Sequence, residues 1–464
     1  MRFILVLLFI IVILLIPERF SDFSVKYHYA LFAISLLGLL IHLRNQKIKN
    51  WLRIDLIFII GFFIVHLQWP LLSILGIEPE NFDRIWINKN IANYASWLST
   101  LGLISWYNGF NLLYIPQENT LKNNIVNNGL DNNTAIKNSF FINSSLILFI
   151  AFILTVGKDF LSGNYLGEQN WSTVSSYIYI LFQTLIVLSW VIELYNNKKS
   201  RSQKTLKLIQ NLDKKLILLT LCYLLLFLSI GDRGGPLQLI SAIFVTYSAI
   251  YRNFKLLETF IGITICALLF TLIGIGRSSQ EGSSLLEGIS LFEHSGFHTL
   301  TLELSNSIRT LYTALIHVPD YHEYFYGQLW LSNILSVIPF AQNIFINATD
   351  MEVYELGSAG YITFITFGPA SISGEGTTLI GDIYLNFGGL GVVFFMGILG
   401  YIFSKIIWNT ENTTSIKWLL LNAIFATIAL YISRGSFFMF LRPLFWSIFI
   451  LWLFTKIKWK VRIY

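Results

Sequence analysis

The sequence has few charged residues and almost no cysteine. Asp, Glu, Lys and Arg make up only 12% of its 464 residues, whereas a soluble globular domain has about 25%. Such sparse charge cannot cover the surface of a soluble protein of this length, which excludes a soluble enzyme. The two cysteines, Cys222 and Cys266, lie in apolar runs, which excludes a disulfide framework. A hydrophobic content of 55% and a mean hydropathy of +0.62 instead predict a polytopic membrane protein.

Long apolar runs predict about twelve membrane-spanning helices, each needing roughly 20 mostly apolar residues. We interpret the first run as a short span, because Pro17 and its neighbours offer no small-residue site for signal-peptide cleavage. The predicted spans are 3–16, 27–43, 54–76, 91–114, 140–157, 172–194, 215–230, 237–251, 258–276, 379–405, 417–433 and 441–456. The predicted fold is therefore an all-α transmembrane bundle.

The distribution of charge predicts how the bundle is oriented. With the N-terminus inside, 22 of the 32 Lys and Arg residues fall on the inner side, and 19 of the 26 Asp and Glu residues fall outside. By the positive-inside rule, both termini are cytoplasmic. The net charge of +6 then reflects basic inner loops, and we expect no nucleic-acid partner.

One external segment is too long to be a simple connection. Residues 277–378 separate nine predicted spans in 1–276 from three in 379–464, which divides the chain into three parts. Within the external segment, Leu304, Ile308 and Leu311 belong to a helical stripe that we expect to pack against the bundle.

Known cofactor and metal motifs are absent from the sequence. It has no glycine-rich phosphate loop, and His294 and His298 lack the arrangement of a zinc site. We therefore expect neither a cofactor nor a metal.

Four arginines at predicted outer helix ends are the most informative charged residues. Arg233 precedes Gly234, Gly235 and Pro236 at the start of a span, where free backbone N–H groups favour an anion. The guanidinium fork matches a phosphate group, and an arginine inside an apolar run usually faces a cavity or an anion. The four predicted diphosphate ligands are Arg233, Arg277, Arg434 and Arg442.

A second group of polar residues lies where the tenth predicted span begins. Asp382 and Asn386 are four residues apart and share a helix face, with Tyr384 between them. A buried carboxylate can act as a general base, and Glu375 and His298 are alternative bases. Capping by Asp382 and ordinary helix packing remain the alternative interpretation.

Other polar residues in predicted spans look isolated. Asp55, His66, Gln68 and Glu193 each stand alone in an apolar run. We interpret His66 as a core histidine with satisfied hydrogen bonds.

The chain resembles the Wzy-type polymerases of O-antigen and capsular polysaccharide. The resemblance lies in the Gly231-Asp232-Arg233-Gly234 turn, in the long external loop with Trp330 and Ile338-Pro339, and in the Asp-x-Tyr-x-Asn-Phe-Gly sequence that begins at Asp382. One departure is that Asp382 stands where the family usually has Glu.

This resemblance implies a membrane glycosyltransferase of the bacterial cytoplasmic membrane. Its substrate would be an oligosaccharide linked to undecaprenyl diphosphate at the outer face of the bilayer, and the growing glycan would pass to a new lipid-linked unit. A chain-length co-polymerase is a candidate partner on which the sequence is silent. The alternatives are a flippase for the same lipid-linked oligosaccharide and a ligase that transfers the glycan to a lipid acceptor.

Overall fold

The computed structural model describes residues 2–77, 85–112, 137–157, 160, 171–197, 205–278, 301–369, 371, 374–413 and 415–461. In 205–207, 269–278, 455–461 and at residue 303, only the backbone is described. The described residues form helices and contain no strand, which confirms the predicted all-α class.

Each predicted span coincides with a helix, and the ends differ from the prediction by up to seven residues, most at the end of the tenth span. These helices are α1 (Arg2–Leu14), α2 (Val25–Gln46), α3 (Ile54–Ile74), α5 (Ala92–Asn111), α7 (Ser139–Thr155), α9 (Thr173–Asn196), α11 (Lys214–Ile230), α12 (Gly234–Ile250), α13 (Leu256–Ser278), α20 (Leu379–Asn412), α21 (Ile416–Ile428) and α22 (Leu441–Val461). Four of them, α2, α3, α9 and α20, are long and apolar enough to cross a membrane. The number of crossings stays a prediction.

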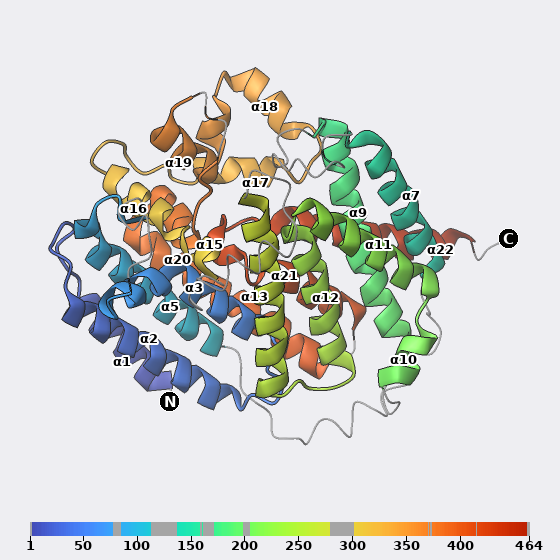
Figure 1. Cartoon of the computed structure of the whole chain (residues 1–464), viewed down its shortest axis with the longest axis horizontal. Helices are drawn as coiled ribbons and strands as arrows, with labels where there is room; N and C mark the ends of the chain where they lie inside the picture. The colour runs from blue at the N-terminus through green and yellow to red at the C-terminus, as the bar shows by residue number, and fades with distance from the viewer. Residues whose placement is uncertain are drawn as a thin grey trace.

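Shorter helices lie at the two ends of the bundle (Figure 1). The segment before α20 forms α15 (Leu302–Ser305), α16 (Ile308–His317), η5 (Gln328–Trp330), α17 (Leu331–Leu335), α18 (Ala341–Thr349), η6 (Val353–Leu356) and α19 (Ser358–Phe367). We call this set the outer layer. The N-terminus and α10 (Thr205–Asn211) lie at the opposite end of the molecule.

Hydrogen bonds between loops support the predicted alternation of the helices. At the predicted outer end, the Ser21 amide donates to the Asn90 carbonyl over 3.0 Å. At the predicted inner end, the Trp51 amide donates to the Phe254 carbonyl, also over 3.0 Å. Loops predicted to share a side are thus joined, as an up-and-down bundle requires.

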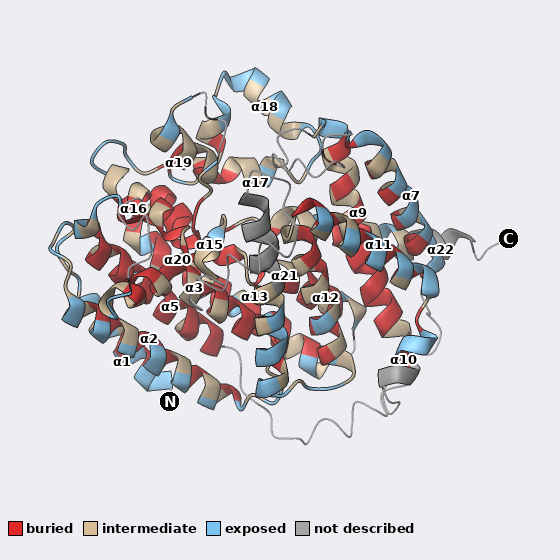
Figure 2. Ribbon diagram, in the orientation of Figure 1, coloured by how far each residue is buried: buried red, intermediate tan, exposed pale blue. Residues whose placement is uncertain are grey.

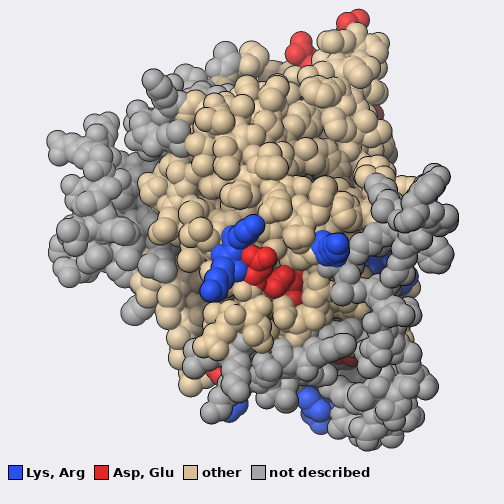
Figure 3. Space-filling model, turned by 90° about the vertical axis from the view of Figure 1, so that its right-hand side faces the viewer, with Lys and Arg blue, Asp and Glu red and all other residues tan. Residues whose placement is uncertain are grey.

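The surface of the bundle is mostly apolar, as a bilayer requires. Large apolar side chains are exposed on α7, α11 and α13, where Leu154, Leu225 and Phe260 point outward. Figure 2 shows exposed residues along these helices and buried ones at the centre, and Figure 3 shows one side of the molecule with few charged atoms.

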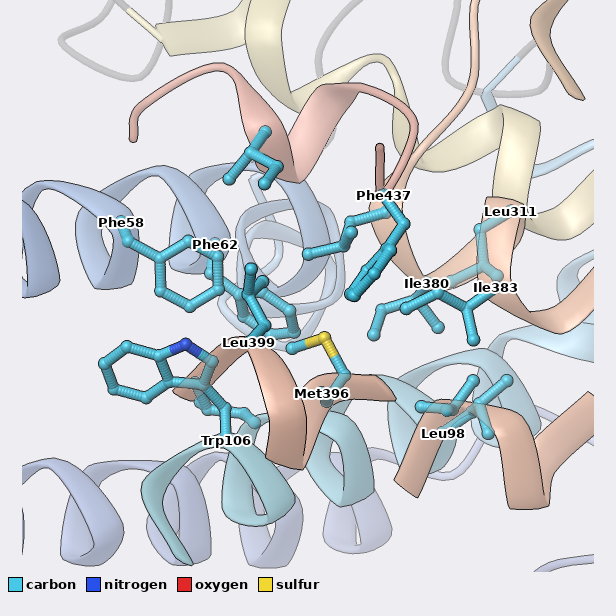
Figure 4. Close-up of a cluster of buried hydrophobic side chains, with 14 of the residues drawn as sticks. Phe58, Phe62, Leu98, Trp106, Leu311, Ile380, Ile383, Met396, Leu399 and Phe437 are labelled. Atoms are coloured by element: carbon cyan, nitrogen blue, oxygen red, sulfur yellow. The ribbon is translucent and has the colours of Figure 1, made fainter. Parts of the chain in front are cut away.

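The buried side chains form two hydrophobic clusters that do not follow the order of the chain. One cluster joins α1, α2, α3, α5 and α20 to the outer layer, and the other joins α7, α9, α11 and α12. Helix α21 belongs to both, because Phe425 packs into the first cluster and Leu420 into the second. In the close-up of Figure 4, Phe58, Trp106, Met396 and Phe437 converge from four different elements.

Helices α5 and α20 approach each other closely enough for their backbones to touch. A Cβ atom on Gly109 would lie 1.9 Å from the Gly397 carbonyl oxygen, and one on Gly400 would lie 2.2 Å from the Trp106 carbonyl oxygen. Small residues at such a crossing allow close packing of membrane helices. This contact fixes the position of α20, the helix that carries Asp382.

The tenth predicted span is not one continuous helix. Gly388 has φ 65° and ψ −161°, a conformation that only glycine readily adopts, and it breaks α20 into two helical parts. A Cβ atom at this position would also lie 3.0 Å from the Tyr324 ring. Gly388 therefore redirects the chain within the predicted span. The part before the kink lies buried beneath the outer layer.

The prediction that Asp55 is isolated is wrong. His42 lies 3.1 Å from Asp55 Oδ2, and Arg53 donates to both carboxylate oxygens over 3.0 and 2.8 Å. Arg53 also reaches Glu411 at 3.5 Å, which connects the inner ends of α2, α3 and α20. Arg53 and Asp55 both lie at the start of α3, whereas His42 and Glu411 come from α2 and α20, so these two contacts depend on how the helices pack.

Candidate functional site

Asp382 is fully buried and both of its carboxylate oxygens accept hydrogen bonds. Trp330 Nε1 donates to Oδ2 over 2.8 Å, and the Phe437 amide donates to the same oxygen over 2.7 Å. Ser358 Oγ donates to Oδ1 over 2.5 Å. One side chain thus joins η5, α19 and the segment that follows α21.

The Phe437 contact connects Asp382 to a predicted diphosphate ligand. Arg434 ends the short η7 helix (Ile432–Arg434), three residues before Phe437, and its side chain is exposed. The Trp330 ring stacks on the Phe437 ring with 5.6 Å between centroids. The structure therefore brings two separately predicted features, Asp382 and the Arg434 turn, into one assembly.

Asn386 and Tyr384 hold the outer layer on the same stretch of α20. Asn386 Oδ1 accepts from the Gly327 and Leu329 amides over 3.0 and 3.3 Å, and its Nδ2 donates to the Asp382 carbonyl over 2.8 Å. Tyr384 is buried and its hydroxyl donates to the Val318 carbonyl over 3.2 Å. The predicted face shared by Asp382 and Asn386 is confirmed, and it faces the protein interior.

Glu375 is the predicted base that reaches the surface. Its carboxylate is 10% exposed and forms an ion pair with Arg309, with 2.8 Å between Oε1 and Nη2. The Glu375 amide donates to Thr363 Oγ1 on α19 over 3.0 Å. A contact from α19 therefore holds the Glu375 backbone, and a contact from α16 orients its carboxylate.

The other predicted ligands lie at the outer ends of helices. Arg233 is the residue directly before α12, and Arg442 is the second residue of α22; both are partly exposed. Helix α12 packs on α21, which leads into the Arg434 turn. The side chain of Arg277, at the end of α13, and all of His298 lie outside the described residues.

The glycines next to Arg233 differ from the prediction in one respect. The Gly234 amide donates to Asp232 Oδ1 over 2.9 Å, so this amide at the start of α12 is already occupied. Helix α12 begins at Gly234, which makes Pro236 its third residue rather than its first. A Cβ atom on Gly235 would lie 2.1 Å from the Tyr223 hydroxyl, so this glycine allows close packing.

His66 is the core histidine that we expected. It is fully buried, and its ring lies beside the backbone of Ser433 in η7, directly before Arg434. The Ser433 hydroxyl is buried as well. Helix α3 thus packs this histidine against the Arg434 turn.

Sequence reasoning did not identify two outer arginines. Arg309 pairs with Glu375, with 2.8 Å between Nη2 and Oε1. Arg19 pairs with Asp320 at 2.7 Å and donates to the Leu315 and Val318 carbonyls. Both belong to the ten Lys and Arg residues on the predicted outer side. Positive charge is scarce on that side, and this scarcity is the one signal that could have drawn attention to them.

Comparison with known proteins gives one match. Residues 1–460 match the family model described as O-antigen polysaccharide polymerase Wzy. No curated protein and no solved structure matches the chain. The match covers the helices and the outer layer together.

Proposed function

Because the chain belongs to the Wzy family of O-antigen polysaccharide polymerases, whose members act on lipid-linked oligosaccharide repeat units in a membrane, we propose that it joins such units while they are carried on undecaprenyl diphosphate. The reaction would take place at the outer face of the bacterial cytoplasmic membrane. The observation that carries the proposal is a partly exposed, ion-paired carboxylate, Glu375, which contacts the same helix as the Arg434 turn. Thr363 of α19 accepts from the Glu375 amide, and Ser358 at the start of α19 lies 3.5 Å from Ser436 in that turn.

The proposed reaction needs two kinds of group from the protein. An acceptor hydroxyl attacks the anomeric carbon of the donor, and its proton passes to a base. The bond from that carbon to the diphosphate breaks, and the lipid diphosphate leaves with the electron pair. No nucleotide is needed, because the donor already carries its leaving group.

We assign the base to Glu375 rather than to Asp382. Both Asp382 oxygens are occupied by donors and the side chain is fully buried, so an acceptor hydroxyl has no access to it. Glu375 is partly exposed, and Arg309 holds its carboxylate in one direction. Orientation of the reacting groups is a large part of catalysis in such transfers. His298 stays an alternative base.

We propose that the leaving diphosphate is bound by four arginines, which are Arg233, Arg277, Arg434 and Arg442. Donors aimed at developing negative charge stabilise the transition state, and removing one typically lowers the rate by about 10²–10³. Arg434 is supported best, because its turn is held in place through Phe437 by Asp382 and its side chain is exposed.

The test is reconstitution of the purified chain with lipid-linked repeat units in liposomes. We expect a ladder of products longer than one unit. A flippase would move the units across the bilayer without a ladder, and a ligase would transfer glycan only when a lipid acceptor is added. Either of these results would contradict the proposal.

In the same assay, Glu375→Gln should lower the rate of ladder formation by about 10²–10⁴, the usual contribution of a general base. The protein should still insert at its normal level, because Gln has nearly the shape of Glu and its amide oxygen can still accept a hydrogen bond from Arg309. Asp350→Asn is the matched control: Asp350 is an exposed outer carboxylate with φ 54°, a conformation that Asn tolerates. If Glu375→Gln still produced normal ladders, the base would be His298 or Asp382 and not Glu375.

A further inference from the structure

Five rings in the outer layer form a continuous cluster next to the proposed site. They belong to the end of α16, the loop that follows it, and α19, and they are His317, Tyr321, His322, Phe325 and Tyr361. We call this cluster the aromatic platform. Neither the motif search nor the apolar stripe indicated it, because the rings come from two segments that are far apart in the sequence.

Tyr361 is the ring that holds the platform together. It is buried, and its ring meets His317, His322 and Phe325 nearly edge-on, with centroid distances of 5.9, 5.7 and 4.6 Å. Such edge-to-face contacts are favourable arrangements of aromatic rings. Tyr361 thus fixes the three rings around it.

The two outermost rings each have one covered and one open face. Tyr321 stacks on His317 at 5.3 Å and is 75% exposed. His322 stacks on Phe325 at 4.2 Å with only 7° between the ring planes, and it is exposed too. Because a second ring covers one face of each, the opposite faces of Tyr321 and His322 are turned to the outside.

The loop that carries these rings is anchored at both ends. The Tyr384 hydroxyl and Arg19 donate to the Val318 carbonyl, and the Phe325 amide donates to the Leu385 carbonyl over 3.0 Å. The platform is therefore preformed, and a ligand would pay little conformational entropy to order it.

The chemistry of the platform fits a hydroxyl-rich neutral ligand better than a phosphate. The charged neighbours in the loop are acidic, and Asp320 is already paired with Arg19. Burial lowers the pKa of His317, and repulsion from His322 lowers it further, which favours a neutral imidazole near pH 7. Tyrosine and histidine offer an apolar face together with a polar edge that hydrogen-bonds.

We propose that the aromatic platform binds the oligosaccharide part of the substrate, with the apolar faces of sugar rings against Tyr321 and His322. This inference rests on the proposed function and adds a glycan-binding surface to it. Helix α16 connects this surface to the site, because His317 in the platform lies eight residues, about two turns, after Arg309, which pairs with Glu375. A glycan on the platform would thus extend outward from the Glu375 region.

The test compares the full-length wild-type protein with the double variant Tyr321→Ala/His322→Ala. The probe for binding is the lipid-free oligosaccharide released by mild acid from the cell's own lipid-linked repeat units, followed by saturation-transfer NMR. We expect the double variant to bind it at least about tenfold more weakly and to produce shorter ladders. Tyr321→Phe/His322→Phe keeps both rings and should retain most of the binding.

Tyr326→Ala is the matched control, because Tyr326 is 71% exposed in the same loop and stacks on no ring within the described residues. It should bind and polymerise like the wild-type protein. If the double alanine variant bound the oligosaccharide and formed ladders like the wild-type protein, the proposed role of the platform would be wrong. The proposed polymerase function would not be affected. A wild-type protein that binds the oligosaccharide but forms no ladder would instead overturn the proposed function.

Discussion

Asp382 and Glu375 are two carboxylates seven residues apart in the chain with different surroundings. Asp382 accepts three hydrogen bonds in a fully buried position, whereas Glu375 has one cation partner and some contact with solvent. A buried carboxylate is tolerated only when its oxygens are satisfied, and then it fixes the groups that donate to it. Asp382 therefore acts as a positioning residue in our assignment, and Glu375 as the group that meets substrate.

Asp382→Asn should reduce stability as well as activity. The amide places an NH2 group among donors, and each charge-assisted hydrogen bond that is lost is worth about 1.5–3 kcal/mol. We expect a lower melting temperature of the purified protein and less ordered outer loops. An unchanged melting temperature with complete loss of polymerisation would instead favour Asp382 as the base.

Arg434→Ala should abolish long polymers while the protein inserts normally, because the exposed guanidinium has no role in the core. Arg434→Lys should restore little activity, since a lysine lacks the planar fork that binds two phosphate oxygens. Chain length in cells can be read on polysaccharide gels. Lys26→Ala, at an exposed cation near the start of α2, is the control that should change nothing. Normal polymers from Arg434→Ala would rule out its diphosphate role.

At the scale of elements, α20 has two different tasks on either side of Gly388. The part before the kink anchors the outer layer through Asp382, Tyr384 and Asn386. The part after it packs tightly on α5 through Gly397 and neighbouring small residues. The positions of the side chains around Asp382 thus depend on the contact between α5 and α20 deep in the bundle.

Gly109→Ala tests this dependence. Its new methyl group would meet the Gly397 backbone, which cannot move aside as a flexible side chain would, so we expect a loss of about 1–3 kcal/mol in stability and lower activity. Gly262→Ala on α13 is the matched control, because a Cβ atom there meets nothing within 4 Å. The measurement is the melting temperature of each purified variant in detergent. Equal melting temperatures would show that α5 and α20 can separate without cost.

For the whole molecule, hydrogen bonds tie each end of the bundle together. The Arg53–Asp55–His42 network joins helices at the predicted inner end, and Arg19 joins the first outer loop to the end of α16. Two hydrophobic clusters share α21, so the helices of the nine predicted spans before the outer layer and of the three after it do not form separate bodies. The outer layer rests on this combined support.

The sequence by itself determined the helices, because apolar run length and charge asymmetry follow directly from the bilayer. It also singled out Arg434 and Asp382 as candidate site residues, since charges are rare in such a chain. Only the tertiary structure decided what surrounds them: Asp382 has its donors on three elements distant in sequence, and Arg309 pairs with Glu375 more than sixty residues away. Local patterns fix which residues lie in a helix, but hydrogen-bond partners across the bundle depend on how the helices pack.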